Sequence, residues 1–166
     1  GRLSVTGELG YEIHCRMGDH IALRRLLLKA GAECGIREFG FNALLSLRLE
    51  KGFGIWSAEF TQGYTPGMTG MDRWIDWEKE EFIGQAAAIK ERDGNGPAQK
   101  LVMLEIDADD ADASGYEPVW NNDSLVGFVT SGGYGHTLKK SLAMALVNND
   151  LANENQKLKV HVVGVE

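Results

Sequence analysis

The sequence lacks any apolar run long enough to cross a membrane, and we expect no secretory leader. It also lacks a run of lysine or arginine, and its net charge of -7 disfavours a nucleic-acid-binding surface. The first residue is not methionine, so we expect a segment of a longer protein. These absences argue against membrane and nucleic-acid partners and lead us to expect a cytoplasmic protein.

Cysteine is scarce, because only Cys15 and Cys34 occur and neither belongs to a metal-ligand motif. The four histidines are too scattered to predict a zinc site, so we expect no bound metal. Both thiols are expected to be reduced and buried. With 166 residues, 43% hydrophobic and 25% charged, the chain can bury a core as one domain or two small ones.

The most informative stretch runs over residues 6–14, where glycines precede an alternating segment. The alternation predicts a strand with Tyr11 and Ile13 on one face and Glu12 and His14 on the other. A carboxylate held on a rigid strand can accept two parallel hydrogen bonds from a flat ligand. The alternative is a half-exposed strand with solvated acids.

Helical periodicity is clear in three places, which we expect to be residues 19–30, 40–51 and 85–92. In the second of these, Arg48 shares a face with leucines and therefore needs a carboxylate, a carbonyl or a ligand. Ligand binding and a structural role, such as pairing with Glu50, both remain open.

Residues 53–72 are rich in residues typical of loops, including a Pro-Gly pair, and are expected to form a loop. Residues 73–77 are expected to form a short strand that contains two tryptophans. Trp74 and Trp77 are compatible with a flat ligand, although aromatic residues in small domains more often belong to the core. The turn formers of residues 93–97 predict a linker.

Beyond the linker the pattern becomes all-β, which predicts a small barrel or sandwich. Residues 121–124 form a hairpin signal, and the glycine cluster 131–136 is expected to be a turn between strands. That cluster lacks phosphate-loop spacing, and Ser131 has no nucleophile-elbow context to pair with His136. The expected strands cover residues 101–106, 117–120, 125–130, 141–147 and 158–163.

Four motifs in the right order carry a family resemblance: residues 6–12, 46–52, 82–84 and 130–143. Together they resemble the tetrahydrofolate-binding aminomethyltransferase family. This family includes the glycine-cleavage T-protein and the folate-binding halves of dimethylglycine and sarcosine dehydrogenases and oxidases. The resemblance implies an α+β fold, with the end of a ferredoxin-like folate-binding domain over residues 1–96. A small C-terminal β-barrel over residues 97–166 is expected to follow.

Within the family, the chain looks closer to the dimethylglycine/sarcosine branch. Residues 43–45 read Ala-Leu-Leu, where glycine-cleavage proteins carry Ala-Arg-Asp. Phe53 follows Lys51-Gly52, with Trp56 three residues on, which also resembles the dehydrogenase branch. A related branch that serves iron–sulfur assembly has cysteine at the position of Phe53.

The resemblance also implies a cofactor site. Glu12 inherits the role of the glutamate that binds the pterin, and Arg73 lies near the position of a folate-contacting aromatic. Val5 replaces another aromatic of the relatives. No catalytic residue is expected, because the family's acid lies in the N-terminal half. The expected cofactor-binding residues are Glu8, Tyr11, Glu12, Ile13, His14, Arg48 and Arg73.

The implied activity is one-carbon transfer from a methylated amine to tetrahydrofolate, forming 5,10-methylene-tetrahydrofolate. FAD is expected in the missing N-terminal part if the dehydrogenase branch is right, and the fragment alone is expected to be inactive. One alternative is a glycine-cleavage T-protein or a folate-dependent demethylase. The other is a non-catalytic, regulatory folate-binding module.

Overall fold

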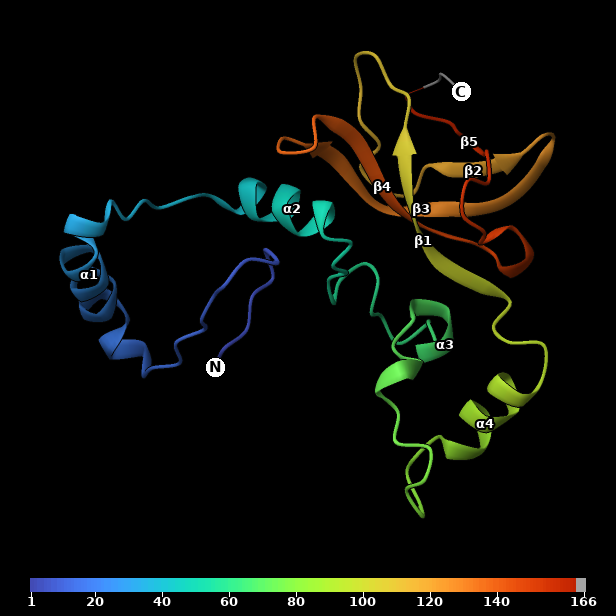
Figure 1. Ribbon diagram of the computed structural model, residues 1–166, viewed down its shortest axis with the longest axis horizontal. Helices are drawn as coiled ribbons and strands as arrows, with labels where there is room; N and C mark the ends of the chain where they lie inside the picture. The colour runs from blue at the N-terminus through green and yellow to red at the C-terminus, as the bar shows by residue number, and fades with distance from the viewer. Residues whose placement is uncertain (164–166) are drawn as a thin grey trace.

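The computed structural model describes residues 1–163 and combines helices in the first part of the chain with a five-stranded antiparallel sheet in the second (Figure 1). This confirms the expected α+β class. The helices are α1 (His20–Ala30), α2 (Phe41–Glu50), α3 (Pro66–Thr69) and α4 (Gln85–Asp93). Short 3-10 turns add η1 (Met17–Asp19), η2 (Ala32–Cys34), η3 (Asp72–Trp74) and η4 (Asn149–Leu151).

The periodicity of residues 19–30 produces α1, which ends where the backbone N–H of Gly31 donates to the carbonyl of Leu27. Asp19 precedes the helix but makes no side-chain capping bond. No residue of α1 is buried, so its apolar stripe faces solvent. Within residues 1–163 the helix therefore lacks the packing of its apolar face that usually stabilises a helix of this length.

Helix α2 is different, because its last turns pack onto the sheet. Leu49 is buried against Leu142 and Met144, with Leu101 beside them. The helix begins after Gly40, whose carbonyl accepts from the N–H of Leu44. It is thus the element that connects the N-terminal residues to the sheet.

The sheet contains the main core. Its strand order is β1-β4-β3-β2-β5, and every neighbouring pair is antiparallel. The inner strand β4 is buried along nearly its whole length, since both of its edges are paired and both of its faces are covered. The strands are β1 (Gln99–Ile106), β2 (Pro118–Asn121), β3 (Ser124–Gly135), β4 (Lys140–Asn148) and β5 (Lys159–Val160).

The glycine cluster 131–136 is not a turn, contrary to the sequence-based expectation. Residues up to Gly135 belong to β3, and the turn to β4 occupies residues 136–139. A side chain at Gly132 would clash with the backbone of Ala113, so glycine is required there by close approach of two backbones. The predicted turn at residues 121–124 is confirmed, with Asn122 at φ +52°.

The strand expected from Tyr11 onward is also absent. Residues 11–16 are irregular, and only Glu12 makes a strand-like exchange, donating its N–H to the Gly1 carbonyl while its own carbonyl accepts from the Gly1 nitrogen. One such pair is not a ladder, and a strand forms only where successive residues find partners.

Three further expectations differ from the structure. Residues 73–77 form no strand, because η3 ends at Trp74 and extended backbone without a neighbour follows. Strand β5 is only two residues long, Lys159–Val160. Cys15 and Cys34 are free but exposed, since the region around α1 has no packing partner to bury them.

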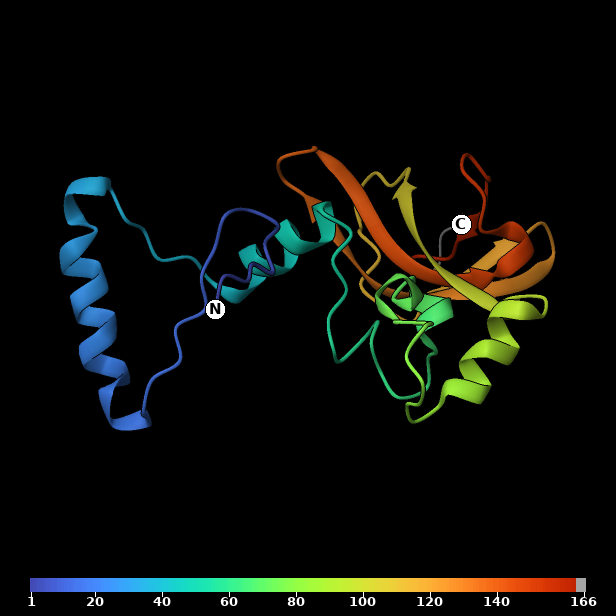
Figure 2. The ribbon, with the colours of Figure 1, turned by 60° about the horizontal axis from the view of Figure 1, so that its bottom comes forward.

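Figures 1 and 2 both show α1 and the opening loop as an arm that projects away from the sheet. No residue before Arg48 is buried. Within residues 1–163, no helix combines the length and apolar character needed to cross a membrane. The proposed division at residue 96 stays a prediction, although α4 ends at Asp93 and β1 begins at Gln99, on either side of it.

Candidate functional site

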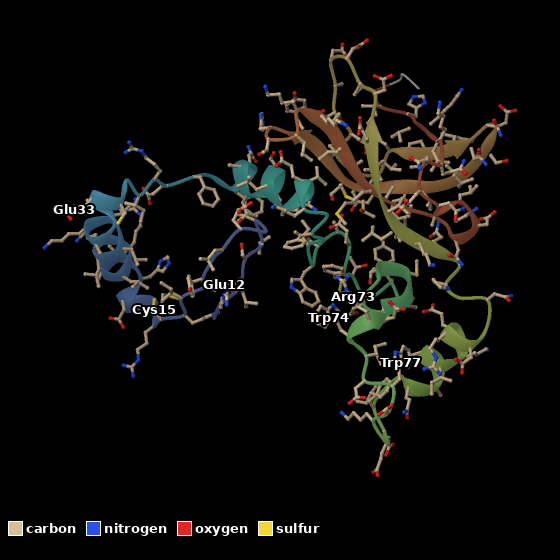
Figure 3. The ribbon with its side chains drawn as sticks, viewed as in Figure 1. Glu12, Cys15, Glu33, Arg73, Trp74 and Trp77 are labelled. Atoms are coloured by element: carbon tan, nitrogen blue, oxygen red, sulfur yellow. The ribbon has the colours of Figure 1, made fainter. Side chains whose placement is uncertain are left out.

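The opening loop presents Glu12 on the arm (Figure 3). Its backbone is fixed by the two hydrogen bonds to Gly1, at 2.9 and 2.8 Å. Its carboxylate Oε2 lies 3.5 Å from His14 Nε2, and the Glu12 side chain is 46% exposed. The carboxylate therefore sits on an anchored backbone yet retains surface for a ligand.

Tyr11 and Ile13, the neighbours of Glu12, line a different surface. They border an open groove of about 350 Å³ together with α1 and Ile36. The predicted two-faced alternation thus holds in part, although no strand forms. Arg24 closes one rim through a two-bond contact with Glu38, at 2.7 and 2.6 Å, and that contact raises the pKa of the guanidinium.

Lys51 ties the opening loop to α2. Its Nζ lies 3.1 Å from Glu8 Oε1, and its alkyl stem fills the space where a side chain at Gly7 would stand. Both charged side chains are largely exposed, so the ion pair by itself contributes little. The steric contact at Gly7 is the firmer restraint.

Arg48 does not reach the surface, because its side chain is only 3% exposed. Its Nη1 donates to the Phe53 carbonyl at 3.2 Å and lies 3.5 Å from Glu59 Oε2. Burial lowers the pKa of the guanidinium, and the charge of Glu59 partly opposes that shift. Of the two roles left open by the sequence, the structure supports the structural one, with Glu59 rather than Glu50 as partner.

Arg73 belongs to a separate segment from Glu12 (Figure 3). Its guanidinium carbon lies 5.5 Å from the ring centre of Trp74, which is 74% exposed. Trp77 is half-buried beneath Arg92, 4.4 Å from the ring centre. Trp74 is therefore not a core residue, and its exposed ring beside a cation remains open to a planar ligand.

The structure thus places Glu8, Tyr11, Ile13 and His14 in the same loop as Glu12, with the His14 ring beside the Glu12 carboxylate. It buries Arg48 and places Arg73 in another segment. Chemically, the loop offers a carboxylate acceptor next to apolar surface. Within residues 1–163, no three histidine, cysteine or acidic side chains gather to hold a metal. The carboxylate of Glu12 can accept hydrogen bonds from a bound ligand.

Sequence reasoning missed the most buried acid among residues 1–163. Glu59 is 0% exposed and lies in the 53–72 loop, where no periodicity marks a buried position. The available signal was Arg48, whose place on an apolar stripe requires a carboxylate partner. Glu50 was the nearest candidate in sequence, but it instead accepts from the N–H of Thr137 at 2.6 Å.

Comparison with known families matches two domain models to the chain. Residues 1–79 match the GCVT N-terminal domain, and residues 99–166 match the glycine cleavage T-protein C-terminal barrel domain. Between them, the two models account for most of the sequence.

Similar proteins agree with these matches. Mitochondrial dimethylglycine dehydrogenase of Homo sapiens is 38% identical over 98% of this chain, which spans 19% of that protein. An aminomethyltransferase of Geobacillus thermodenitrificans is 35% identical over 98% of this chain, which spans 44% of that protein. The chain therefore spans less than half the length of these relatives.

A solved structure shows the same fold. The crystal structure of glycine cleavage system aminomethyltransferase T from Bartonella henselae superimposes with a TM-score of 0.87 at 27% identity. The match covers 98% of this chain and 45% of that one. Taken with the two domain matches, this shows that the chain belongs to the glycine cleavage T-protein family.

Proposed function

We propose that this chain is the C-terminal part of a longer, folate-dependent enzyme that moves a one-carbon unit from an amine to tetrahydrofolate. The observation that carries the proposal is the half-exposed carboxylate of Glu12, whose backbone is held by two hydrogen bonds to Gly1 in the opening loop. The family relationship supports folate as the ligand.

The chemistry of the pterin edge fits a carboxylate. The 2-amino group and the adjacent ring N–H are neighbouring donors, and one carboxylate can accept both in parallel. Glu8, Tyr11, Ile13 and His14 would shape the surroundings of Glu12, and Arg73 would act from its own segment. Because Arg48 is buried, we leave it out of the proposed site. The contribution of this chain is then to orient the pterin, which is catalysis by proximity.

Within the family, we propose the dimethylglycine/sarcosine branch. Its support is the 38% identity to dimethylglycine dehydrogenase and the Ala-Leu-Leu sequence at residues 43–45. A methylated amine would then be oxidised at a flavin bound elsewhere in the longer protein. Tetrahydrofolate supplies the nitrogens that capture the one-carbon unit as 5,10-methylene-tetrahydrofolate.

The apolar surface of the arm supports a further part of the proposal. Tyr11, Ile13 and Leu27 are exposed and line the groove, and such a cluster of exposed apolar side chains is typical of a surface that another part of the protein covers. We propose that the preceding part of the longer protein packs here and completes the folate site. A cytoplasmic location remains a prediction; the dimethylglycine dehydrogenases similar to this chain are named as mitochondrial.

The test is an assay of the longer protein with tetrahydrofolate and dimethylglycine or sarcosine. Formation of 5,10-methylene-tetrahydrofolate with reduction of the flavin would support the dehydrogenase branch. Turnover that requires an aminomethyl-loaded carrier protein instead would support a glycine-cleavage T-protein.

Three other results count against the proposal. Methyl transfer that yields 5-methyl-tetrahydrofolate would indicate a demethylase. Folate binding without turnover of any of these donors would indicate a regulatory module, and absence of folate binding would overturn the proposal entirely.

A further inference from the structure

A fully buried carboxylate joins three parts of the molecule that are far apart in sequence. Glu59 is 0% exposed and is followed by the half-buried Phe60, in the segment of residues 53–60 between α2 and α3. A charged side chain in such a place is stable only when nearly all of its acceptor positions are filled.

Those positions are filled from both sides. Oε1 accepts from the hydroxyls of Thr130 at 2.7 Å and Ser131 at 2.6 Å, both on β3. Oε2 accepts from the backbone N–H of Ile55 at 2.9 Å and lies 3.5 Å from Arg48 on α2. One oxygen therefore faces the sheet, and the other faces the helix and the loop.

The two hydroxyls come from consecutive residues, which a regular strand cannot offer, because successive side chains point to opposite faces. The register of β3 against β4 explains the exception. Val129 pairs with Ala145 and Ser131 pairs with Met144, so Thr130 is an extra residue in a β-bulge. A bulge re-aims a side chain and brings Thr130 and Ser131 to the same oxygen.

We infer that Glu59 is a latch that fastens residues 53–60 and α2 to the sheet, and that the bulge at Thr130 supplies its second hydroxyl. The latch matters for geometry because α2 also carries Lys51, which contacts the opening loop at Gly7 and Glu8. The orientation of the arm relative to the sheet thus depends in part on this buried carboxylate, together with the contacts of Leu49 and Glu50 with the sheet. This inference does not depend on the folate assignment.

The test uses Glu59→Gln in the whole chain, with hydrogen exchange followed amide by amide. Glutamine keeps the shape but removes the negative charge that faces Arg48. Its NH₂ group can still meet the Thr130 and Ser131 hydroxyls, which then accept instead of donating, so the charge-assisted hydrogen bonds to the hydroxyls and to the Ile55 N–H are replaced by weaker neutral ones. Exchange at Ile55 and its neighbours in residues 53–60 should accelerate about tenfold or more. Amides of β1, on the far edge of β4, should keep their protection.

A second variant approaches the latch from the sheet. Thr130→Val with Ser131→Ala removes both hydroxyl donors without adding bulk, and it should accelerate the same amides. Combined with Glu59→Gln, it should add less than its separate effect, because both changes break one interaction. The matched control is Glu117→Gln, since Glu117 also accepts from backbone N–H groups but within its own loop.

Two outcomes would overturn the latch. The first is unchanged exchange at residues 53–60 in Glu59→Gln. The second is equal loss of protection in β1 and in residues 53–60, which would make Glu59 a general core residue. If Glu59→Gln does not fold, the Thr130/Ser131 variant alone decides between these results.

Discussion

At the scale of single residues, the chain uses its carboxylates in three different ways. Glu12 is half-exposed with a histidine nearby, Glu59 is buried among donors, and Glu117 caps a loop. From the sequence, only Glu12 can be distinguished from the other two, because it stands in an alternating motif. Burial of Glu59 depends on residues 71 and 72 positions later in the chain, and no local pattern reports such contacts.

Arg48 gives a prediction that separates its structural role from ligand binding. Arg48→Met removes the positive charge beside Glu59 and leaves a buried carboxylate with one partner fewer. The free energy of unfolding should fall by about 3 kcal/mol. Urea unfolding measures this, and the exposed Arg25→Met on α1 is the control. An unchanged midpoint would show that Arg48 is not structural.

Glu117 predicts a dependence of stability on pH. Burial acts to raise the pKa of its carboxyl, but the N–H groups of Ser114 and Gly115, both at 2.7 Å, outweigh it, so the pKa lies below 4.5. A lowered native pKa gives stability that is present above the unfolded value and lost as pH falls through the native value.

Stability should therefore decline below about pH 4.5, and Glu117→Gln should remove its share of that decline. At neutral pH the variant should be less stable by about 1–2 kcal/mol. Thermal unfolding measured between about pH 3 and pH 7, a range that brackets the ordinary pKa of a carboxyl group, tests this prediction. If both proteins lose stability in parallel as pH falls, the carboxyl makes no such contribution.

At the scale of elements, three of the four α-helices and most strands of the sheet could be predicted from the sequence, whereas α3 lies in residues 53–72, which were expected to form a loop. Periodicity predicted α1, α2 and α4 within about one or two residues, and the hairpin at residues 121–124 was recognisable from its turn formers. The prediction of a turn at the glycine cluster was wrong, because glycine occurs both in turns and where two backbones approach closely. Only the packing of Ala113 over β3 distinguishes the two uses.

Gly132 provides the corresponding prediction. A valine there would collide with the Ala113 backbone, and the loop over β3 would have to move. We expect a loss of about 2–4 kcal/mol in the free energy of unfolding. Gly18→Ala is the control, because no atom lies within reach of its added carbon. Equal stability of the two variants in urea would refute the close-approach explanation.

At the scale of the whole molecule, the C-terminal part of the chain packs around a core, whereas the N-terminal part does not. The sheet with the end of α2 has a core, whereas no residue before Arg48 is buried. This explains why the opening strand was not found: its alternating pattern anticipates a neighbour that residues 1–163 do not provide. An alternating sequence pattern shows that a segment can form a strand, but the strand forms only where a neighbouring strand pairs with it.

The open arm predicts a difference between this chain and the longer protein. Alone, the chain should bind a hydrophobic dye at the groove formed by Tyr11, Ile13 and α1. In the longer protein the same groove should be covered, and dye fluorescence per mole should fall several-fold. Leu27→Glu, which places a charge in the groove, should lower the signal of the chain alone. Equal fluorescence of both proteins would contradict the proposed covering.

The central claim is that Glu12 binds the pterin, and titration of the longer protein with tetrahydrofolate tests it most directly. Glu12→Gln replaces one acceptor oxygen by a donor, so the dissociation constant should rise about 100-fold, while the melting temperature stays the same. Glu33→Gln, an exposed acid on the same arm, should bind as the unmodified protein does. A folded Glu12→Gln protein with unchanged affinity for tetrahydrofolate would contradict the account.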